Sequence, residues 1–137
     1  MTTKLPYKAT NGSAGLDLYA AVKDPVTIAP QGLISIPTGV AVGFPDAYCA
    51  GFVYARSGLA TRHGIALSNG VGVIDSDYTG EIIVGLCNLS SEPYTIEPGE
   101  RIAQLVVTQI ATIDIEWDED LEKTARNDAG FGSTGRF

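Results

Sequence analysis

The sequence predicts a single all-β domain, either a sandwich or a barrel. Sixteen glycines and seven prolines punctuate the 137 residues, at intervals of about eight to twelve residues, which is the turn spacing of such folds. The runs between these turns are short and rich in β-branched residues. The length fits one domain, and an apolar content of 45% is sufficient for a hydrophobic core.

Five runs are predicted as strands. Within the second run, Val40, Val42 and Phe44 alternate with Ala41 and Gly43, so one face of this strand is expected to pack inward. The predicted runs are residues 26–30, 33–44, 81–90, 94–100 and 101–110.

Two of these runs are apolar on both faces, at residues 82–84 and 102–107. The core of a small domain covers only one face of a strand. An apolar second face therefore predicts a subunit interface that covers it. The only predicted helix spans residues 57–63 and ends at Gly64. Residues 116–123 read EWDEDLEK and predict a solvated connection that is anchored by Trp117.

Charge and composition exclude several classes of partner. A net charge of −7 argues against binding to the nucleic-acid backbone, which requires a basic face. No apolar run approaches the ~18 residues of a membrane span, and the N-terminus lacks a signal-peptide core. Cys49 and Cys87 each lie in an apolar run and are expected to be free thiols in a reducing cytoplasm. The nucleus is the alternative for a eukaryotic or viral source.

Several polar residues interrupt the strand pattern. Asp17 lies between two leucines, where a solvent-facing edge residue is the simplest interpretation. Gln104 shares a strand face with apolar residues and should have a specific partner, because a buried unpaired amide costs ~1–3 kcal/mol. Arg56, Ser57 and Gly58 follow an aromatic strand, and helix capping by Ser57 is there as well supported as a functional role.

The stretch NGVGVIDSDYTGEI, residues 69–82, carries the most information. Asp, Ser and Gly are turn formers, so a turn is one interpretation. A turn does not require Tyr78 or two carboxylates directly after Ile74, however. Asp75 beside an apolar segment is also a candidate for a carboxylate that is held in a fixed, partly dry setting, as a general base requires.

Together with the tail, these places resemble the trimeric deoxyuridine triphosphatase (dUTPase) family. Five motifs appear in the family's order over nearly the whole chain, which is a far stronger signal than any one of them. They are AGLDLYA (14–20), RSGLA (56–60), GVIDSDYTGE (72–81), GERIAQLV (99–106) and RNDAGFGSTG (126–135). The resemblance implies a distorted jelly-roll-like β-barrel over residues 1–125 and a mobile, glycine-rich C-terminal arm over residues 126–137.

The resemblance further implies hydrolysis of dUTP to dUMP and pyrophosphate by attack of water on the α-phosphorus. Asp75 would be the general base. Mg²⁺ would chelate the triphosphate, with Asp17 held to the ion through water. The phosphate oxygens would be bound by Arg56, Ser57, Gly58 and Gln104. Magnesium and clustered arginines would allow an acidic protein to bind a polyanion.

By the same resemblance, uracil would bind against residues 69–74, where the Asn69 amide and the main chain read its hydrogen-bonding edge. Tyr78 would stack under the deoxyribose and exclude a 2′-hydroxyl. Close backbone approach would depend on the glycines in this stretch. The residues implied in binding the nucleoside are Asn69, Gly72, Val73, Ile74, Tyr78 and Gly80.

The family's arm closes over the nucleotide at a site shared between the subunits of a homotrimer. Arg126 would bind the terminal phosphates together with Gly132, Ser133 and Thr134, and Phe131 would cover the uracil.

Three rival interpretations remain at this point. The dCTP deaminases are similar but require a glutamate on the strand after the aspartate motif, and here residues 82–86 read IIVGL. A phage-type regulatory binding protein usually carries an inserted segment that this chain has no room for. A purely structural trimer would leave Asp75 and Gln104 unexplained.

Overall fold

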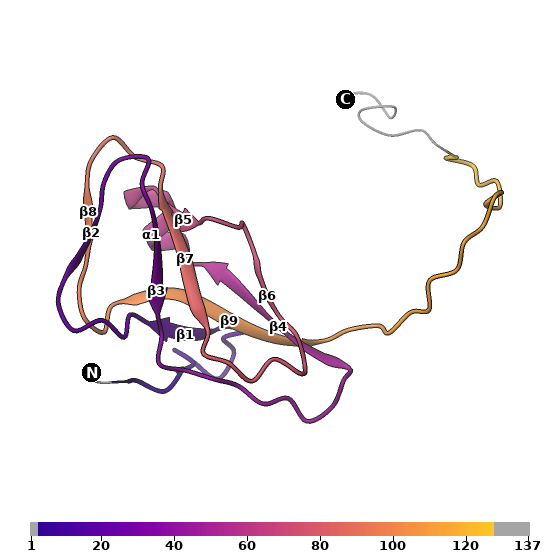
Figure 1. Cartoon of the computed structure of the whole chain (residues 1–137), viewed down its shortest axis with the longest axis horizontal. Coiled ribbons are helices and arrows are strands. Elements are labelled where there is room, and N and C mark those ends of the chain that lie inside the picture. The colour runs from indigo at the N-terminus through magenta and orange to yellow at the C-terminus, as the bar shows by residue number, and fades with distance from the viewer. Residues whose placement is uncertain (1–2, 128–137) are drawn as a thin grey trace.

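The computed structural model describes residues 3–127, and its regular structure consists of short antiparallel strands and one short helix, joined by long connections (Figure 1). The strands are β1 Leu16–Tyr19, β2 Val26–Ile28, β3 Leu33–Pro37, β4 Cys49–Ala55, β5 Ile65–Leu67, β6 Gly72–Ile74, β7 Ile83–Asn88, β8 Tyr94–Ile96 and β9 Arg101–Gln109. They form three sheets, in the orders β1-β9-β4-β6, β2-β8 and β3-β7-β5. The all-β prediction is therefore confirmed.

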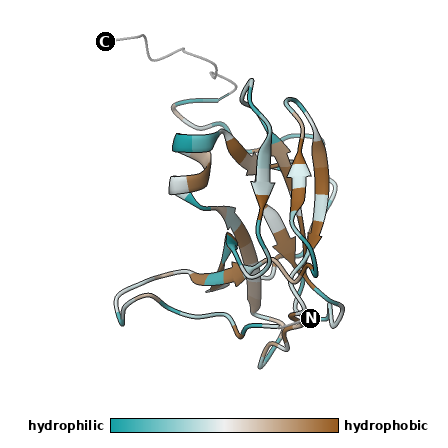
Figure 2. Cartoon of the chain, turned by 90° about the vertical axis from the view of Figure 1, so that its left-hand side faces the viewer, coloured by the Kyte–Doolittle hydropathy of each residue, from teal (hydrophilic) through white to brown (hydrophobic). Residues whose placement is uncertain are grey.

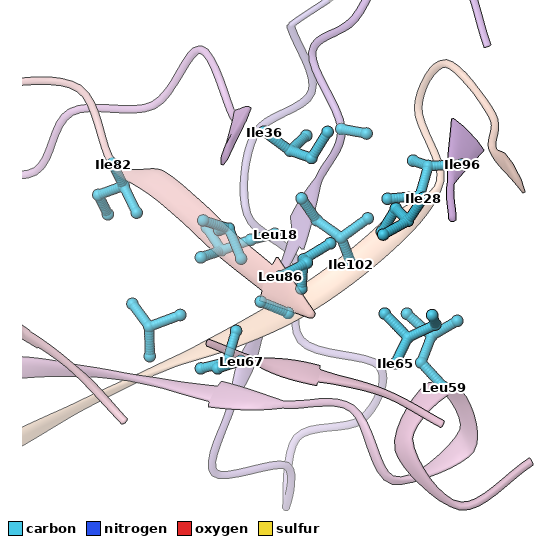
Figure 3. Packing of buried hydrophobic residues seen from close by; sticks show 14 of the residues in the cluster. Leu18, Ile28, Ile36, Leu59, Ile65, Leu67, Ile82, Leu86, Ile96 and Ile102 are labelled. Atoms are coloured by element: carbon cyan, nitrogen blue, oxygen red, sulfur yellow. The ribbon is translucent and has the colours of Figure 1, made fainter. Parts of the chain in front are cut away.

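The core lies between these sheets and consists of aliphatic side chains (Figure 3). Leu18, Ile36, Leu86 and Ile102 come from different strands and are each at most 1% exposed. Such close packing of aliphatic residues is the main source of stability in a domain of this size. Figure 2 shows that the apolar residues are concentrated in the strands.

The predicted helix is confirmed as α1, Ser57–His63. It ends at Gly64, which adopts the left-handed conformation (φ 69°) and donates its N–H to the Ala60 carbonyl. Glycine adopts this conformation without a steric penalty. The helix begins after Arg56, and no side chain caps its N-terminus, so the capping interpretation of Ser57 is wrong.

The strand predicted over residues 33–44 is too long. It ends at Pro37, because Gly39 has a φ of 68° and turns the chain. Val40 then bonds the Thr38 hydroxyl through its N–H and the Ile82 N–H through its carbonyl, instead of joining a ladder. The predicted alternation still holds in this loop, since Val40 is buried and Ala41 is exposed.

The two runs that are apolar on both faces differ in exposure. In β7, Ile83 is 50% exposed between buried Ile82 and Val84. In β9 both faces are covered within the chain at Ile102 and Ala103, and the exposed apolar residue is Val107 near the end of the strand. After β9, residues 110–127 run away from the barrel (Figure 1). Trp117 in this segment is 92% exposed, so it does not anchor the segment to its own chain as predicted.

Cys49 and Cys87 are both free thiols, as predicted. No helix among residues 3–127 is long and apolar enough to cross a membrane.

Candidate functional site

Three of the sequence motifs meet at one cavity of about 330 Å³. β1 contributes Asp17, the start of α1 contributes Ser57 and Gly58, and β9 contributes Gln104. β9 lies between β1 and β4 in the sheet and pairs Gln104 with Asp17 on one side and with Tyr54 on the other. The order of the strands therefore explains why residues far apart in the sequence line the same cavity.

Gln104 has the specific partner that its position required. Its Nε2 donates a hydrogen bond to the Ala55 carbonyl, at 3.1 Å. Gly15 lies so close that a Cβ there would be 2.5 Å from Gln104 Oε1. A side chain at position 15 would therefore displace the amide that faces the cavity.

Asp17 is held between two guanidinium groups. Its Oδ1 lies 3.1 Å from Arg56 Nε and its Oδ2 lies 3.1 Å from Arg101 Nη1. β1 is an edge strand, but the Asp17 side chain is only 13% exposed, so it is more than a solvent-facing edge residue. Arg56 also donates Nη1–H to the Arg101 carbonyl, at 3.2 Å, which ties the start of α1 to β9.

Arg101 was missed by the sequence analysis. It lines the cavity and contributes a second positive charge beside Arg56. Strict alternation along β9 would put its side chain on the face opposite to Gln104. The register with β1 shifts between Leu18 and Tyr19, and this irregularity interrupts the alternation at the point where Arg101 pairs.

The aspartate motif forms the turn that its composition indicated. The Tyr78 N–H donates to the Asp75 carbonyl at 3.1 Å, directly after β6. Asp75, Tyr78 and Glu81 line a cavity of about 180 Å³ together with apolar residues of β6 and β7. Asp75 is exposed, so one chain alone does not give it the partly dry setting that a general base requires.

A cavity of about 160 Å³ adjoins the cavity that Asp75 lines, and the two cavities share Val73, Ile74 and Ile83. Asn69 and Gly72, which belong to the stretch predicted to bind the nucleoside, line it. A Cβ on Gly72 would lie 3.1 Å from the Val53 side chain, so a larger residue there would force Val53 to shift.

The two groups of residues are far apart in one chain. Ile74 pairs with Gly51 near the start of β4, whereas Arg56 follows the end of that strand. Five strand steps of about 3.3 Å separate Gly51 from Arg56, or roughly 17 Å. Asp75 thus lies near one end of β4. The cavity lined by Arg56 and Gln104, which we call the phosphate-side cavity after the predicted role of its residues, lies at the other end.

The predicted arm lies mostly beyond residue 127, the last residue that the structure describes. Arg126 lies in the described segment after β9. Gly80, which belongs to the predicted nucleoside-binding residues and not to the arm, lies in the loop between β6 and β7. Phe131, Gly132, Ser133 and Thr134 lie outside the described residues. Residues 3–127 contain no cluster of three or more His, Cys, Asp or Glu side chains that could hold a metal ion by themselves.

The chain is similar to known proteins over nearly its whole length. The sequence model of the dUTPase family matches residues 2–135. Deoxyuridine 5'-triphosphate nucleotidohydrolases of Desulfitobacterium hafniense and Legionella pneumophila are 49% and 43% identical to the chain. These alignments cover 96% and 99% of this chain and 87% and 90% of the relatives.

Two solved structures extend the similarity to three dimensions. The Staphylococcus bacteriophage 80alpha dUTPase with dUpNHpp has a TM-score of 0.88 at 28% identity, over 98% of this chain and 93% of that one. The dUTPase of Streptococcus mutans has a TM-score of 0.73 at 31% identity, over 80% and 88%. A family match over nearly the full length, with relatives this similar in sequence, means that the chain belongs to the dUTPase family.

Proposed function

We propose that the protein hydrolyses dUTP to dUMP and pyrophosphate, which limits uracil incorporation into DNA and supplies dUMP for thymidylate synthesis. The observation that carries this proposal is the convergence of Arg56, Arg101 and Gln104 on one cavity of an acidic chain. Guanidinium and amide donors in that geometry suit the oxygens of a triphosphate. Family membership supports the same substrate.

Asp75 is the proposed general base. It would accept a proton from the attacking water, which forms the new bond to the α-phosphorus as pyrophosphate leaves. Its position at the rim of an apolar-walled cavity, next to the stretch that would read uracil, supports this role. Tyr78 in the same cavity is the proposed barrier to a 2′-hydroxyl.

The residues present fit a magnesium ion that arrives with the substrate. Asp17 is a single carboxylate at the phosphate-side cavity with both oxygens already bound by arginines. Such a group suits contact with a hydrated ion better than direct coordination. Bound Mg²⁺ would neutralise and polarise the triphosphate. A structural Mg(II) ion is coordinated in a mutant dUTPase of S. aureus phage phi11.

We further propose a homotrimer in which each site combines residues of neighbouring subunits, including residues 126–137. The separation of Asp75 from Arg56 along β4 supports this, because a nucleotide that contacts Arg56 in the same chain lies at the far end of the strand. The exposed apolar residues Val73, Ile83 and Val107 provide surface for subunit contact.

The test is release of pyrophosphate from a panel of nucleoside triphosphates, with and without a chelator. We expect dUTP to be strongly preferred to dCTP, dTTP and UTP, and the chelator to suppress turnover. Equal turnover of dCTP, or release of orthophosphate, would contradict the proposal.

A further inference from the structure

Glu81 is an exposed glutamate to which the sequence analysis gave no role, and it lines the same cavity as Asp75 and Tyr78. Its backbone carbonyl accepts a hydrogen bond from Tyr78. Its carboxylate accepts a hydrogen bond from the loop at Gly39, which is connected to the core. We propose that Glu81 is a positioning residue that holds Tyr78 where it excludes a ribose 2′-hydroxyl. This inference rests on the proposed function, and specifically on the proposed role of Tyr78.

The bond toward the nucleoside side is made by the backbone of Glu81. The Tyr78 phenol donates its O–H to the Glu81 carbonyl at 2.8 Å. The ring also lies directly against Gly80, where a Cβ would be 2.6 Å from the phenol oxygen and 2.7 Å from Cζ. Tyr78 is therefore seated on the backbone of residues 80 and 81, and the placement of that backbone determines the placement of the ring.

The bond toward the barrel is made by the side chain. Glu81 Oε1 accepts a hydrogen bond from the Gly39 N–H at 2.6 Å. A carboxylate that accepts from a backbone amide makes one of the stronger kinds of hydrogen bond. Gly39 has a φ of 68°, which is the conformation that presents this N–H, and a Cβ there would lie 2.6 Å from Thr3 Oγ1.

The loop that contacts Glu81 is itself fixed by the core. Thr38 is fully buried, and its hydroxyl donates to the Ile82 carbonyl at 2.7 Å and accepts from the Val40 N–H at 3.2 Å. The Ile82 N–H in turn donates to the Val40 carbonyl at 2.8 Å. An unbroken series of bonds therefore connects the buried end of the loop, through Glu81, to the exposed phenol of Tyr78.

The Glu81 carboxylate lies at the surface and can be removed without disturbing the core. Truncating it frees the Gly39 N–H at an exposed position, where water replaces the lost acceptor. The fold is expected to survive, while the turn that carries Tyr78 gains freedom. A ring that is less firmly placed excludes the 2′-hydroxyl less well, because sites that reject by shape depend on fixed geometry.

The experiment compares kcat/KM for dUTP and for UTP in Glu81→Ala, Glu81→Gln and Tyr78→Phe. We expect the dUTP-to-UTP ratio to fall by about tenfold in Glu81→Ala, mainly through a lower KM for UTP. Glu81→Gln keeps an oxygen that accepts from Gly39 and should restore the ratio. Tyr78→Phe removes the other end of the series and should resemble Glu81→Ala. Glu97→Ala removes an exposed glutamate from the turn before β9 and serves as the matched control.

The outcomes separate this inference from the function on which it rests. If the wild-type protein does not distinguish dUTP from UTP, both the proposed function and this inference are contradicted. A selective wild type whose ratio is unchanged in Glu81→Ala would overturn the inference alone. If Glu81→Ala does not fold, an unchanged ratio in Tyr78→Phe would overturn it equally.

Discussion

Asp17 organises the charges of the phosphate-side cavity. A lone carboxylate in that place would repel phosphate, but here it binds two guanidiniums, so the three side chains together carry one net positive charge. Each arginine is held in a defined orientation by one carboxylate oxygen. Orientation fixed before binding reduces the entropy lost when a flexible arginine side chain binds a ligand.

Replacement of Arg101 by alanine is expected to raise KM for dUTP by about tenfold with a smaller change in kcat, because the lost interaction serves binding of the triphosphate. Steady-state kinetics measure both constants. Arg62→Ala is the control, since Arg62 is a basic residue in the last turn of α1 and does not line this cavity. An equal rise in KM for Arg62→Ala would show that only overall charge matters.

Replacement of Asp75 by asparagine keeps the shape of the side chain and removes the proton acceptor. We expect kcat to fall by ~10²–10⁴ while the affinity for nucleotide is largely retained. Binding is measured by calorimetry with a non-hydrolysable dUTP analogue. Asp77→Asn, in the same turn, should turn over nearly normally. The reverse pattern would identify Asp77 as the base.

The segment that runs from β8 through the turn at residues 97–100 to β9 is held together by side-chain contacts and packs against α1. Tyr94 donates its O–H to Glu100 Oε1 at 2.6 Å, and the Glu97 N–H donates to the other oxygen of that carboxylate at 2.9 Å. The Tyr94 ring also packs against His63 at the end of α1, with ring centroids 5.0 Å apart. Tyr94 therefore connects α1, through His63, to the turn directly before Arg101 at the start of β9.

Burial, together with the hydrogen bond to Glu100, raises the pKa of Tyr94 from 10.0 to about 12. Folding thus favours the neutral phenol, and this contribution to stability is complete below pH 10.0 and is lost as the pH rises toward about 12. Between these pH values, the free energy of unfolding should fall less steeply in Tyr94→Phe than in the wild type. Denaturant titrations across this range measure both slopes, and parallel slopes would contradict the assignment.

The elements show what local sequence could and could not predict. The bounds of α1 were predictable because Gly64 ends the helix through its own backbone conformation. The end of β3 was not, because the loop in which Gly39 turns the chain is held by the Thr38 hydroxyl, which bonds a residue 44 positions away. Arg101 was missed for a related reason, since the register shift opposite it belongs to the pairing of two strands. Long-range pairing is absent from any local pattern.

The chain as a unit belongs to the family that its five ordered motifs indicated. The motif residues of the phosphate side do meet in one cavity, as the resemblance implied. The distance of Asp75 from that cavity could not be predicted, because motif order says nothing of which end of β4 each motif reaches.

The proposed trimer leads to a complementation test. Arg56→Ala and Asp75→Asn should each be nearly inactive alone. Unfolded together and refolded as a mixture, they should recover up to about one quarter of wild-type activity, because some sites then combine an intact Arg56 with an intact Asp75 from a neighbour. Light scattering reports the oligomeric state. A fully active monomer, or no recovery in trimers that have mixed, would rule out a shared site.

A truncation that ends at Ala125 tests the proposed role of the C-terminal residues. The strands and the core lie entirely before residue 110, so the truncated chain is expected to fold and assemble normally. It should lose most of its kcat/KM, because Arg126 and the residues after it are proposed to align the triphosphate. Circular dichroism and light scattering control for folding and assembly. Full activity of the truncated chain would leave residues 126–137 without a catalytic role.

The length of β4 has a consequence for the protein at low abundance. Because this strand keeps Asp75 and Arg56 apart, a folded chain that has not assembled into the proposed trimer would bind nucleotide without hydrolysing it. Turnover per chain would then rise with protein concentration until assembly is complete, as mass action requires. A molecule that covers the exposed apolar surface around Ile83 would block assembly of the proposed trimer. It would thereby inhibit hydrolysis even though it does not resemble a nucleotide.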